Sequence, residues 1–168
     1  VGTLPLAGSY TIDSTTVTGG TNFESFDAFG SALNTLGVSA AVDVSVAANT
    51  YNEQLSIGEY AGASATNTVT IDGSNVATLT HDQSIRNSTI TLEGASWVTV
   101  KNMTIAATGG TDSWGIHLLD SAHNITIDSN VITLPVGFTA DVAGIISSSS
   151  EDSDVGSGSN AYDITISN

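Results

Sequence analysis

Short stretches of alternating apolar and polar residues recur along most of the chain. Two aliphatic residues flank a polar one in five of them: VDVSV (42–46), VTIDG (69–73), VTVKN (98–102), ITIDS (125–129) and ITISN (164–168). This period of two is typical of a strand that buries one face. The stretches start 27, 29, 27 and 39 residues apart, which predicts an internal structural repeat.

A second strand precedes several of these stretches. Such strands are expected at STITLEG (88–94), WGIHLLD (114–120) and AGIISSS (143–149). Two of the repeats also align without a gap, VTVKNMTI (98–105) over ITIDSNVI (125–132). A unit of about 27 residues with two short strands and almost no helix predicts one coil of a parallel β-helix.

Stacking such coils would align equivalent residues into rows. The expected inward rows are Val98, Ile125 and Ile164, then Val100, Ile127 and Ile166; the outward row is Thr99, Thr126 and Thr165; the corner row is Asn102, Ser129 and Asn168. The longer final interval is explained by a Ser- and Gly-rich loop at 147–160, and 134–141 is a shorter excursion. A β-sandwich would show strands about 8 to 12 residues apart, and a leucine-rich repeat would need more leucines.

One segment, TNFESFDAFGSALNTLG (21–37), has helical periodicity. Its apolar residues Phe26, Phe29, Leu33 and Leu36 predict an amphipathic helix at about 22–36. Thr21 with Glu24 forms an expected capping box, and Gly37 an expected C-terminal stop. We therefore divide the chain into an N-terminal segment with a capping helix (1–41) and the coils (42–168).

Charge limits the kinds of partner. Seventeen acidic residues face two cations, Arg86 and Lys101, for a net charge of -15. This argues against nucleic acids and anionic membrane surfaces, which require clustered Lys and Arg. The chain has no cysteine and no apolar stretch long enough to span a membrane. Calcium is the one cofactor considered, with Glu151, Asp152 and Asp154 as candidate ligands.

The stretches FESFDAFGSALNTLG and VDVSVAANTYNEQLSI resemble the amino-terminal entrance of pectin-lyase-like right-handed β-helix proteins. Within them ANTYNEQLSI (48–57) is similar to the first-coil pattern of pectin methylesterases, with Asn49 at the usual Gly and with Tyr51 and Glu53 kept. The resemblance implies a right-handed β-helix whose open first coil is covered by the helix. The layout also resembles β-helix segments of large secreted bacterial surface proteins, including adhesins exported by the type 9 secretion pathway.

The catalytic groups of the resembled enzymes are not evident. Their lyases use a cationic base, for which Lys101 is the only candidate in the repeats, and Arg86 is assigned no role. Their hydrolases use clustered aspartates, whereas Asp120 and Asp128 fall on different strands. The carboxylate and arginine stretches of their esterases are absent.

Two residues of one coil are candidate ligand-binding residues. Trp114 is expected to offer a stacking face to sugars, and His117, between Ile116 and Leu118, is expected to point outward. Trp97 is expected in a turn, packed against the neighbouring coil.

We expect a non-catalytic structural or adhesive β-helix segment of a large bacterial protein, secreted or displayed on the cell surface. Expected partners are the rest of the same polypeptide, a surface polysaccharide or the secretion machinery. Because no capping element follows DITISN (163–168), the chain is expected to be cut from a longer rod. The alternative is the first part of a polysaccharide lyase, esterase or hydrolase whose catalytic coils lie beyond residue 168. A carbohydrate-binding module is a third possibility.

Overall fold

The computed structural model describes residues 3–82, 88–109, 112–136, 141–149 and 161–168. These residues form one helix, α1 (Phe26–Leu36), and two sheets. The larger sheet contains β1 (Leu6–Ile12), β2 (Asn22–Phe23), β3 (Val38–Val46), β4 (Thr50–Asn52), β6 (Val69–His81), β8 (Val98–Ala107), β10 (His123–Asp128), β11 (Val131–Thr133) and β13 (Tyr162–Ser167). The smaller sheet contains β5 (Leu55–Ile57), β7 (Ser88–Glu93), β9 (Ser113–Leu119) and β12 (Val142–Ser147).

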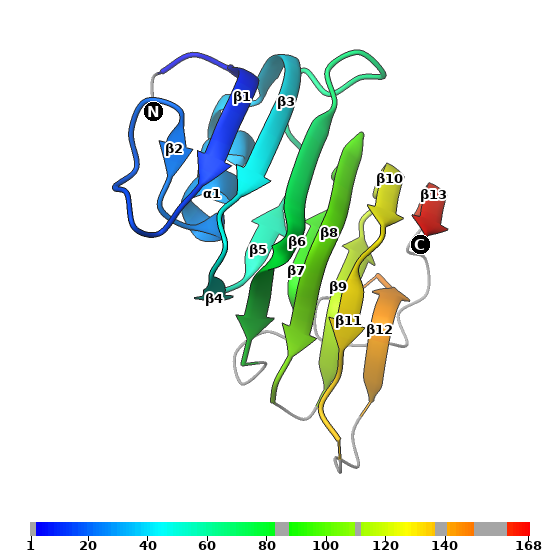
Figure 1. The fold of residues 1–168 in the computed structure, drawn as a ribbon. Coiled ribbons are helices and arrows are strands. Elements are labelled where there is room, and N and C mark those ends of the chain that lie inside the picture. Colours follow the sequence, from blue (N-terminus) through cyan, green and yellow to red (C-terminus); the bar gives the residue numbers. More distant parts are fainter. Residues whose placement is uncertain (1–2, 83–87, 110–111, 137–140, 150–160) are drawn as a thin grey trace.

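The strand pairing is parallel in both sheets. The larger sheet has the order β13-β10-β8-β6-β3-β1-β2, and the smaller sheet has the order β12-β9-β7-β5 (Figure 1). Among the described residues, the antiparallel pairing is an isolated bridge between Gly19 and Asn22. The prediction of an all-β chain with parallel strands is therefore confirmed.

The strand register follows the sequence repeat. Val100 pairs with Ile127, which pairs with Ile166, and Thr99, Thr126 and Thr165 form the neighbouring row. The gapless alignment of 98–105 with 125–132 holds through β11, where Ile132 pairs with Ile105. A slip of one residue would turn every apolar side chain of a strand to solvent, so the apolar pattern fixes this register.

The expected division after residue 41 falls inside β3. This strand pairs with β1 on one side and with β6 on the other. The segment before residue 42 therefore contributes its own strands to the larger sheet.

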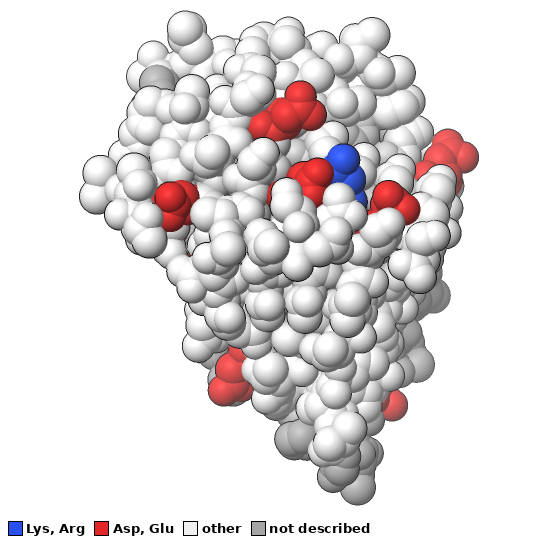
Figure 2. Space-filling view, viewed as in Figure 1, with Lys and Arg blue, Asp and Glu red and all other residues white. Residues whose placement is uncertain are grey.

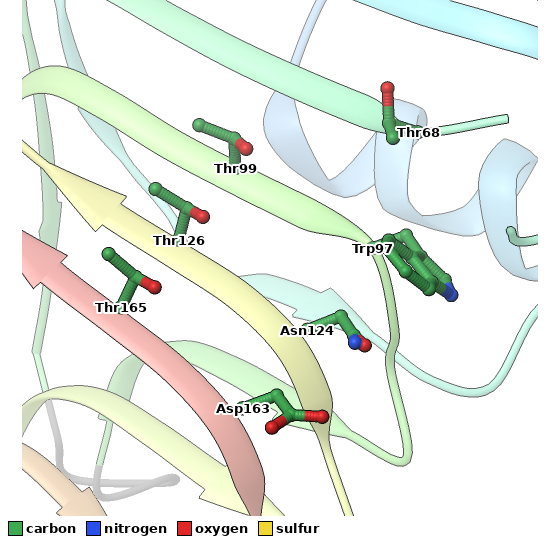
Figure 3. A pocket seen from close by; sticks show the side chains of 7 residues that line it. All are labelled: Thr68, Trp97, Thr99, Asn124, Thr126, Asp163 and Thr165. Atoms are coloured by element: carbon green, nitrogen blue, oxygen red, sulfur yellow. The ribbon is translucent and has the colours of Figure 1, made fainter. Parts of the chain in front are cut away.

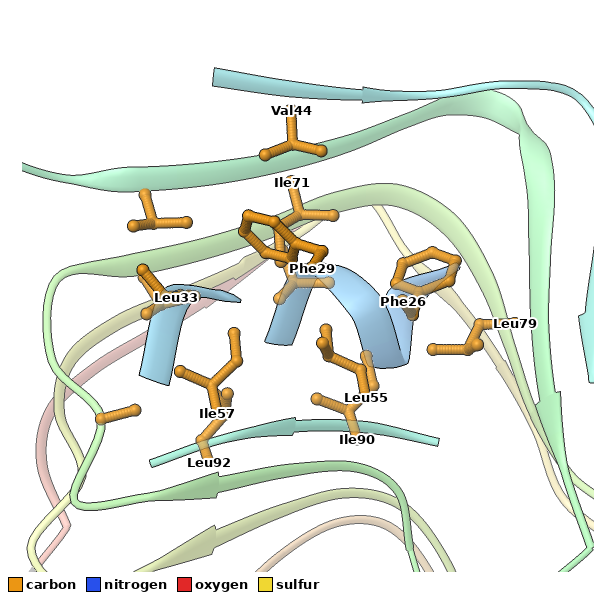
Figure 4. Close-up of a cluster of buried hydrophobic side chains, with 14 of the residues drawn as sticks. Phe26, Phe29, Leu33, Val44, Leu55, Ile57, Ile71, Leu79, Ile90 and Leu92 are labelled. Atoms are coloured by element: carbon orange, nitrogen blue, oxygen red, sulfur yellow. The ribbon is translucent and has the colours of Figure 1, made fainter. Parts of the chain in front are cut away.

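Helix α1 fills the space between the two sheets at one end of the molecule. Phe26, Phe29 and Leu33 are fully buried and belong to one hydrophobic cluster with residues of both sheets. Figure 4 shows these three side chains between the two sheets. Val44 and Ile71 of the larger sheet lie on one side, and the smaller sheet contributes Leu55, Ile57, Ile90 and Leu92 on the other. The predicted helix and its buried face are confirmed.

The helix begins later than the sequence predicted. Ser25 is the N-cap, and its Oγ accepts a hydrogen bond of 2.9 Å from the backbone N–H of Ala28. The expected capping box of Thr21 and Glu24 is wrong, because Asn22 and Phe23 form β2 and pair with β1. Gly37 ends the helix at a φ of 65°, and its N–H donates to the Leu33 carbonyl, as predicted.

The helix also covers the free edge of β5. The Asn34 side chain donates to the Ser56 carbonyl (3.2 Å) and accepts from the Gly58 N–H (2.9 Å), so it takes the place of a neighbouring strand. At the other end the Glu53 carboxylate accepts from the Asp27 N–H at 3.0 Å. Covering an edge in this way protects its unpaired backbone groups from other chains.

Gly30 permits this close approach, so we expect Gly30→Ala to destabilise the protein. A Cβ at residue 30 would lie 2.7 Å from the Ser56 carbonyl oxygen. Alanine favours the helix by about 1 kcal/mol, but the clash costs about 1–3 kcal/mol. Urea unfolding should show a net loss of about 1 kcal/mol for Gly30→Ala. The exposed neighbour Ser31→Ala is the matched control, and stabilisation by both changes would contradict the contact.

Candidate functional site

The outward face of the larger sheet carries polar rows. One row contains Asp43, Thr70, Thr99, Thr126 and Thr165, and the next contains Ser45, Asp72, Lys101, Asp128 and Ser167. The predicted threonine row is therefore confirmed and continues toward β3. Because the strands of a sheet lie about 4.8 Å apart, each row presents closely spaced hydroxyl or charged groups.

A groove of about 240 Å³ lies over one end of the threonine row (Figure 3). Its lining comes from Thr68, Trp97, Thr99, Asn124, Thr126, Asp163 and Thr165. Thr99, Thr126 and Thr165 lie along β8, β10 and β13, and Thr68 immediately precedes β6 (Figure 3). Trp97, Asn124 and Asp163 lie where successive strands begin. The groove thus combines one aromatic ring with hydroxyl, amide and carboxylate groups.

Three lining residues share an unusual backbone conformation. Trp97 has a φ of 59°, and Asn124 and Asp163 each have a φ of 54°. Ser96, His123 and Tyr162 are aligned across the strands, and each of the three lining residues comes directly after one of them in the sequence. The left-handed region is tolerated by Asn and Asp but costs a bulky residue about 1–2 kcal/mol. Strain of this kind persists where the surroundings impose it and is concentrated at functional sites.

Backbone hydrogen bonds hold Trp97 in place. Its N–H donates to the His123 carbonyl (3.3 Å), and its carbonyl accepts from the Val69 N–H (2.9 Å). The indole is half-buried and lines the groove. The sequence predicted Trp97 in a turn with a packing role; it gave no sign of the groove, because a left-handed tryptophan has no sequence signature.

The polar groups of the groove are available to a ligand. Across the described ranges, the side chains of the seven lining residues make no hydrogen bond. Four hydroxyls, an amide and a carboxylate can therefore donate to or accept from a bound molecule.

The candidate lyase base Lys101 is already paired. Its Nζ lies 3.3 Å from Asp72 Oδ2, and the carboxylate also accepts from Asn102 Nδ2 (3.0 Å) and the Ser74 N–H (2.8 Å). Partial burial alone would raise the pKa of Asp72, but these hydrogen bonds and Lys101 lower it. On the face in Figure 2 the blue side chain has red carboxylates beside it.

The two candidate aspartates lie apart. Asp120 follows β9 with a φ of 46°, and Asp128 ends β10, so the length of β10 separates them. Asp128 accepts a hydrogen bond of 2.6 Å from the Ser167 hydroxyl. These residues therefore do not form the carboxylate pair that glycoside hydrolysis requires.

Trp114 and His117 lie in the interior. Both are 0% exposed, their ring centroids are 4.7 Å apart at 72°, and His117 Nε2 lies 2.8 Å from Ser148 Oγ. His117 alternates with Ile116 and Leu118 as predicted, but its face of β9 is covered too, so the side chain does not reach solvent. Burial lowers the pKa of His117 to about 4. Neither ring presents a face to solvent on which a sugar could stack.

The candidate calcium ligands Glu151, Asp152 and Asp154 lie outside the described residues. Within the described ranges, no group of three or more His, Asp or Glu residues could hold a metal ion. No helix found in those ranges has the length and apolar character needed to cross a membrane.

Comparison with known proteins leaves the function to be argued from this geometry. No protein-family model, no curated protein and no solved structure matches the chain.

Proposed function

We propose that the chain is a non-catalytic segment of a right-handed parallel β-helix, which forms a stiff and adhesive part of a large bacterial protein that is secreted or displayed at the cell surface. The observation that carries the proposal is the shared register of the two sheets. Val98 aligns with Val69 in the larger sheet, and Ile116 aligns with Ile90 in the smaller sheet. Each passage of the chain thus adds one strand to each sheet, as a solenoid coil does. The right hand follows the general preference of parallel crossovers.

The distribution of exposed apolar residues supports stacking with further coils. Ile166 is 62% exposed and Tyr162 is 50% exposed, whereas Ile127, which pairs with Ile166 from β10, is buried. Val142 of β12, at the corresponding end of the smaller sheet, is also exposed. A further coil of the same polypeptide would cover these side chains and pair with the edges of β12 and β13, which are the last strands of the two sheets among the described residues. At the opposite end α1 covers the edge of β5.

The occupied state of the charged groups supports a non-catalytic role. Lys101 is held in an ion pair with Asp72, and Asp128 accepts a hydrogen bond from Ser167. The outward face instead offers rows of small polar side chains, which suit reversible contacts. We propose a surface polysaccharide or the secretion machinery as the external partner.

Adding one coil tests the stacking. A copy of residues 103–129 is joined directly after Asn168, because Ser167 is aligned with Asp128 and Lys101. In a solenoid each added coil contributes an interface with its neighbour. We expect a higher urea midpoint, a steeper dependence of the unfolding free energy on urea concentration, and stronger protection of the β13 amides from hydrogen exchange. A scrambled copy of the same residues is the control.

Two results would contradict the proposal. The first is fast hydrogen exchange at the amides of the added copy together with an unchanged urea midpoint, which would exclude stacking. The second is cleavage of polygalacturonate, pectin or xylan by the purified chain, which would exclude the non-catalytic role.

A further inference from the structure

The groove beside Trp97 has the size and composition of a ligand site. Its volume of about 240 Å³ lies just below the usual range of about 300–1,000 Å³ for small-molecule pockets. Its lining crosses β8, β10 and β13, which spans about 10 Å at two strand spacings. These dimensions fit one or two sugar units and are too small for a folded partner.

The lining defines the chemistry of the ligand. An indole ring offers an apolar face that can pack against the C–H face of a pyranose. The Thr99, Thr126 and Thr165 hydroxyls and the Asn124 amide both donate and accept, which matches the hydroxyl groups of a sugar. Asp163 adds carboxylate oxygens that accept hydrogen bonds from hydroxyls.

The negative charge of the groove favours neutral sugars over acidic ones as ligands. The lining contains one carboxylate and no cation, and the chain as a whole has a net charge of -15. Among the described residues, Lys101 is the one Lys or Arg, and its charge is paired with Asp72. A uronic acid or a sulfated sugar would therefore enter an acidic groove without a partner for its charge, which disfavours its binding.

We propose that this groove is a binding site for a neutral glycan, with Trp97 as the stacking platform and the threonine row and Asn124 as the hydrogen-bonding groups. The inference rests on the proposed adhesive role of the outward face and names its site and its ligand class. The left-handed backbone at Trp97 supports it, since the strained conformation directs a large ring to the groove at the start of β8. Repetition of polar groups along the rows suits a ligand that is itself a repeating chain.

Three variants test the site. Trp97→Gly removes the ring and suits the φ of 59°, and Thr126→Val removes one hydroxyl while keeping the shape of the side chain. Thr104→Val is the matched control, because Thr104 is a half-buried threonine of the same sheet that does not line the groove. Circular dichroism and thermal melting establish that each variant is folded.

The ligand class is tested on an array of neutral oligosaccharides built from hexose, pentose and N-acetylhexosamine units, beside oligogalacturonates. The neutral oligosaccharide with the strongest signal is then titrated calorimetrically into each protein. We expect Trp97→Gly to weaken its binding about tenfold and Thr126→Val about fivefold. Thr104→Val should bind as the parent chain does.

Three outcomes would overturn the inference. They are retention of no neutral oligosaccharide, retention of oligogalacturonates alone, and equal binding by the Trp97→Gly and Thr104→Val variants. The added-coil experiment reports on stacking alone. Failure of glycan binding with successful stacking would therefore remove the site and leave the β-helix intact, and the converse result would remove the β-helix alone.

Discussion

Phe29→Ala is expected to lower the free energy of unfolding by about 3–5 kcal/mol, the cost of a large cavity in a well-packed core. The Phe29 ring is fully buried between the two sheets and meets the Phe23 ring edge-on, with centroids 5.4 Å apart. Its removal leaves a cavity next to Leu33 and Val44 (Figure 4). Small domains are stable by about 5–15 kcal/mol, so this loss is a large share of the total.

Two substitutions control this experiment. Phe29→Leu keeps most of the apolar volume and should cost clearly less than Phe29→Ala. Thr35→Ala changes an exposed position of the same helix and should leave the stability within about 0.5 kcal/mol. Urea unfolding gives the stabilities, and hydrogen exchange should locate the loss first in α1 and β5. A loss below about 1 kcal/mol for Phe29→Ala would show that the helix does not fill the core.

The sequence predicted the stacking of the strands because one physical rule governs it. A strand that buries one face must alternate, and parallel strands in the same register must repeat that alternation. The equivalence of Val100, Ile127 and Ile166 therefore follows from their positions in the repeat alone. The extent of β6 was not predicted, since the chain continues past the irregular register between Asp72 and Ala77 as far as His81.

Alternation could not predict whether each face of a strand meets solvent. In β9 it separated His117 from Ile116 and Leu118 correctly, but the second face is also covered, so the histidine is buried. The helix start was missed for a similar reason. Both Thr21 and Ser25 are good N-cap residues, and only the pairing of β2 with β1 decides between them.

The groove could not be predicted from the sequence for a different reason. Its residues are contributed by four segments from Thr68 to Thr165, and their convergence depends on the stacking of the strands. The threonine row was predicted as a polar surface, but Trp114 was preferred over Trp97 as the sugar-stacking residue. Trp97 has a positive φ and lines the groove, whereas Trp114 lies in β9, where both faces of the strand are covered.

The buried histidine is expected to make stability depend on pH between about 6.5 and 4. Burial of His117 lowers its pKa from 6.5 to about 4, since the charged form loses its hydration and gains no counter-charge from Trp114 or Ser148. In this window the unfolded chain binds a proton that the folded chain excludes, so the free energy of unfolding falls as the pH falls. The total loss from this group is about 3 kcal/mol, complete near pH 4 and absent above pH 7.

Comparison with His117→Gln isolates this effect, because glutamine occupies a similar volume, can still bond to the Ser148 hydroxyl and does not titrate. Asp13 and Asp72, whose pKa values are lowered, lose their contributions only below about pH 4, and Glu53, whose pKa is raised, acts in the opposite direction as the pH falls. All three are present in both proteins and cancel in the difference.

Urea unfolding from pH 7.5 to 4.5 should therefore show the wild-type chain losing stability relative to His117→Gln, by about 2 kcal/mol or more at the acidic end. Amide protection should fall first in β9 and β12, the strands that carry and adjoin this contact. Parallel curves for the two proteins would mean that solvent or a charge reaches the imidazole in the folded state.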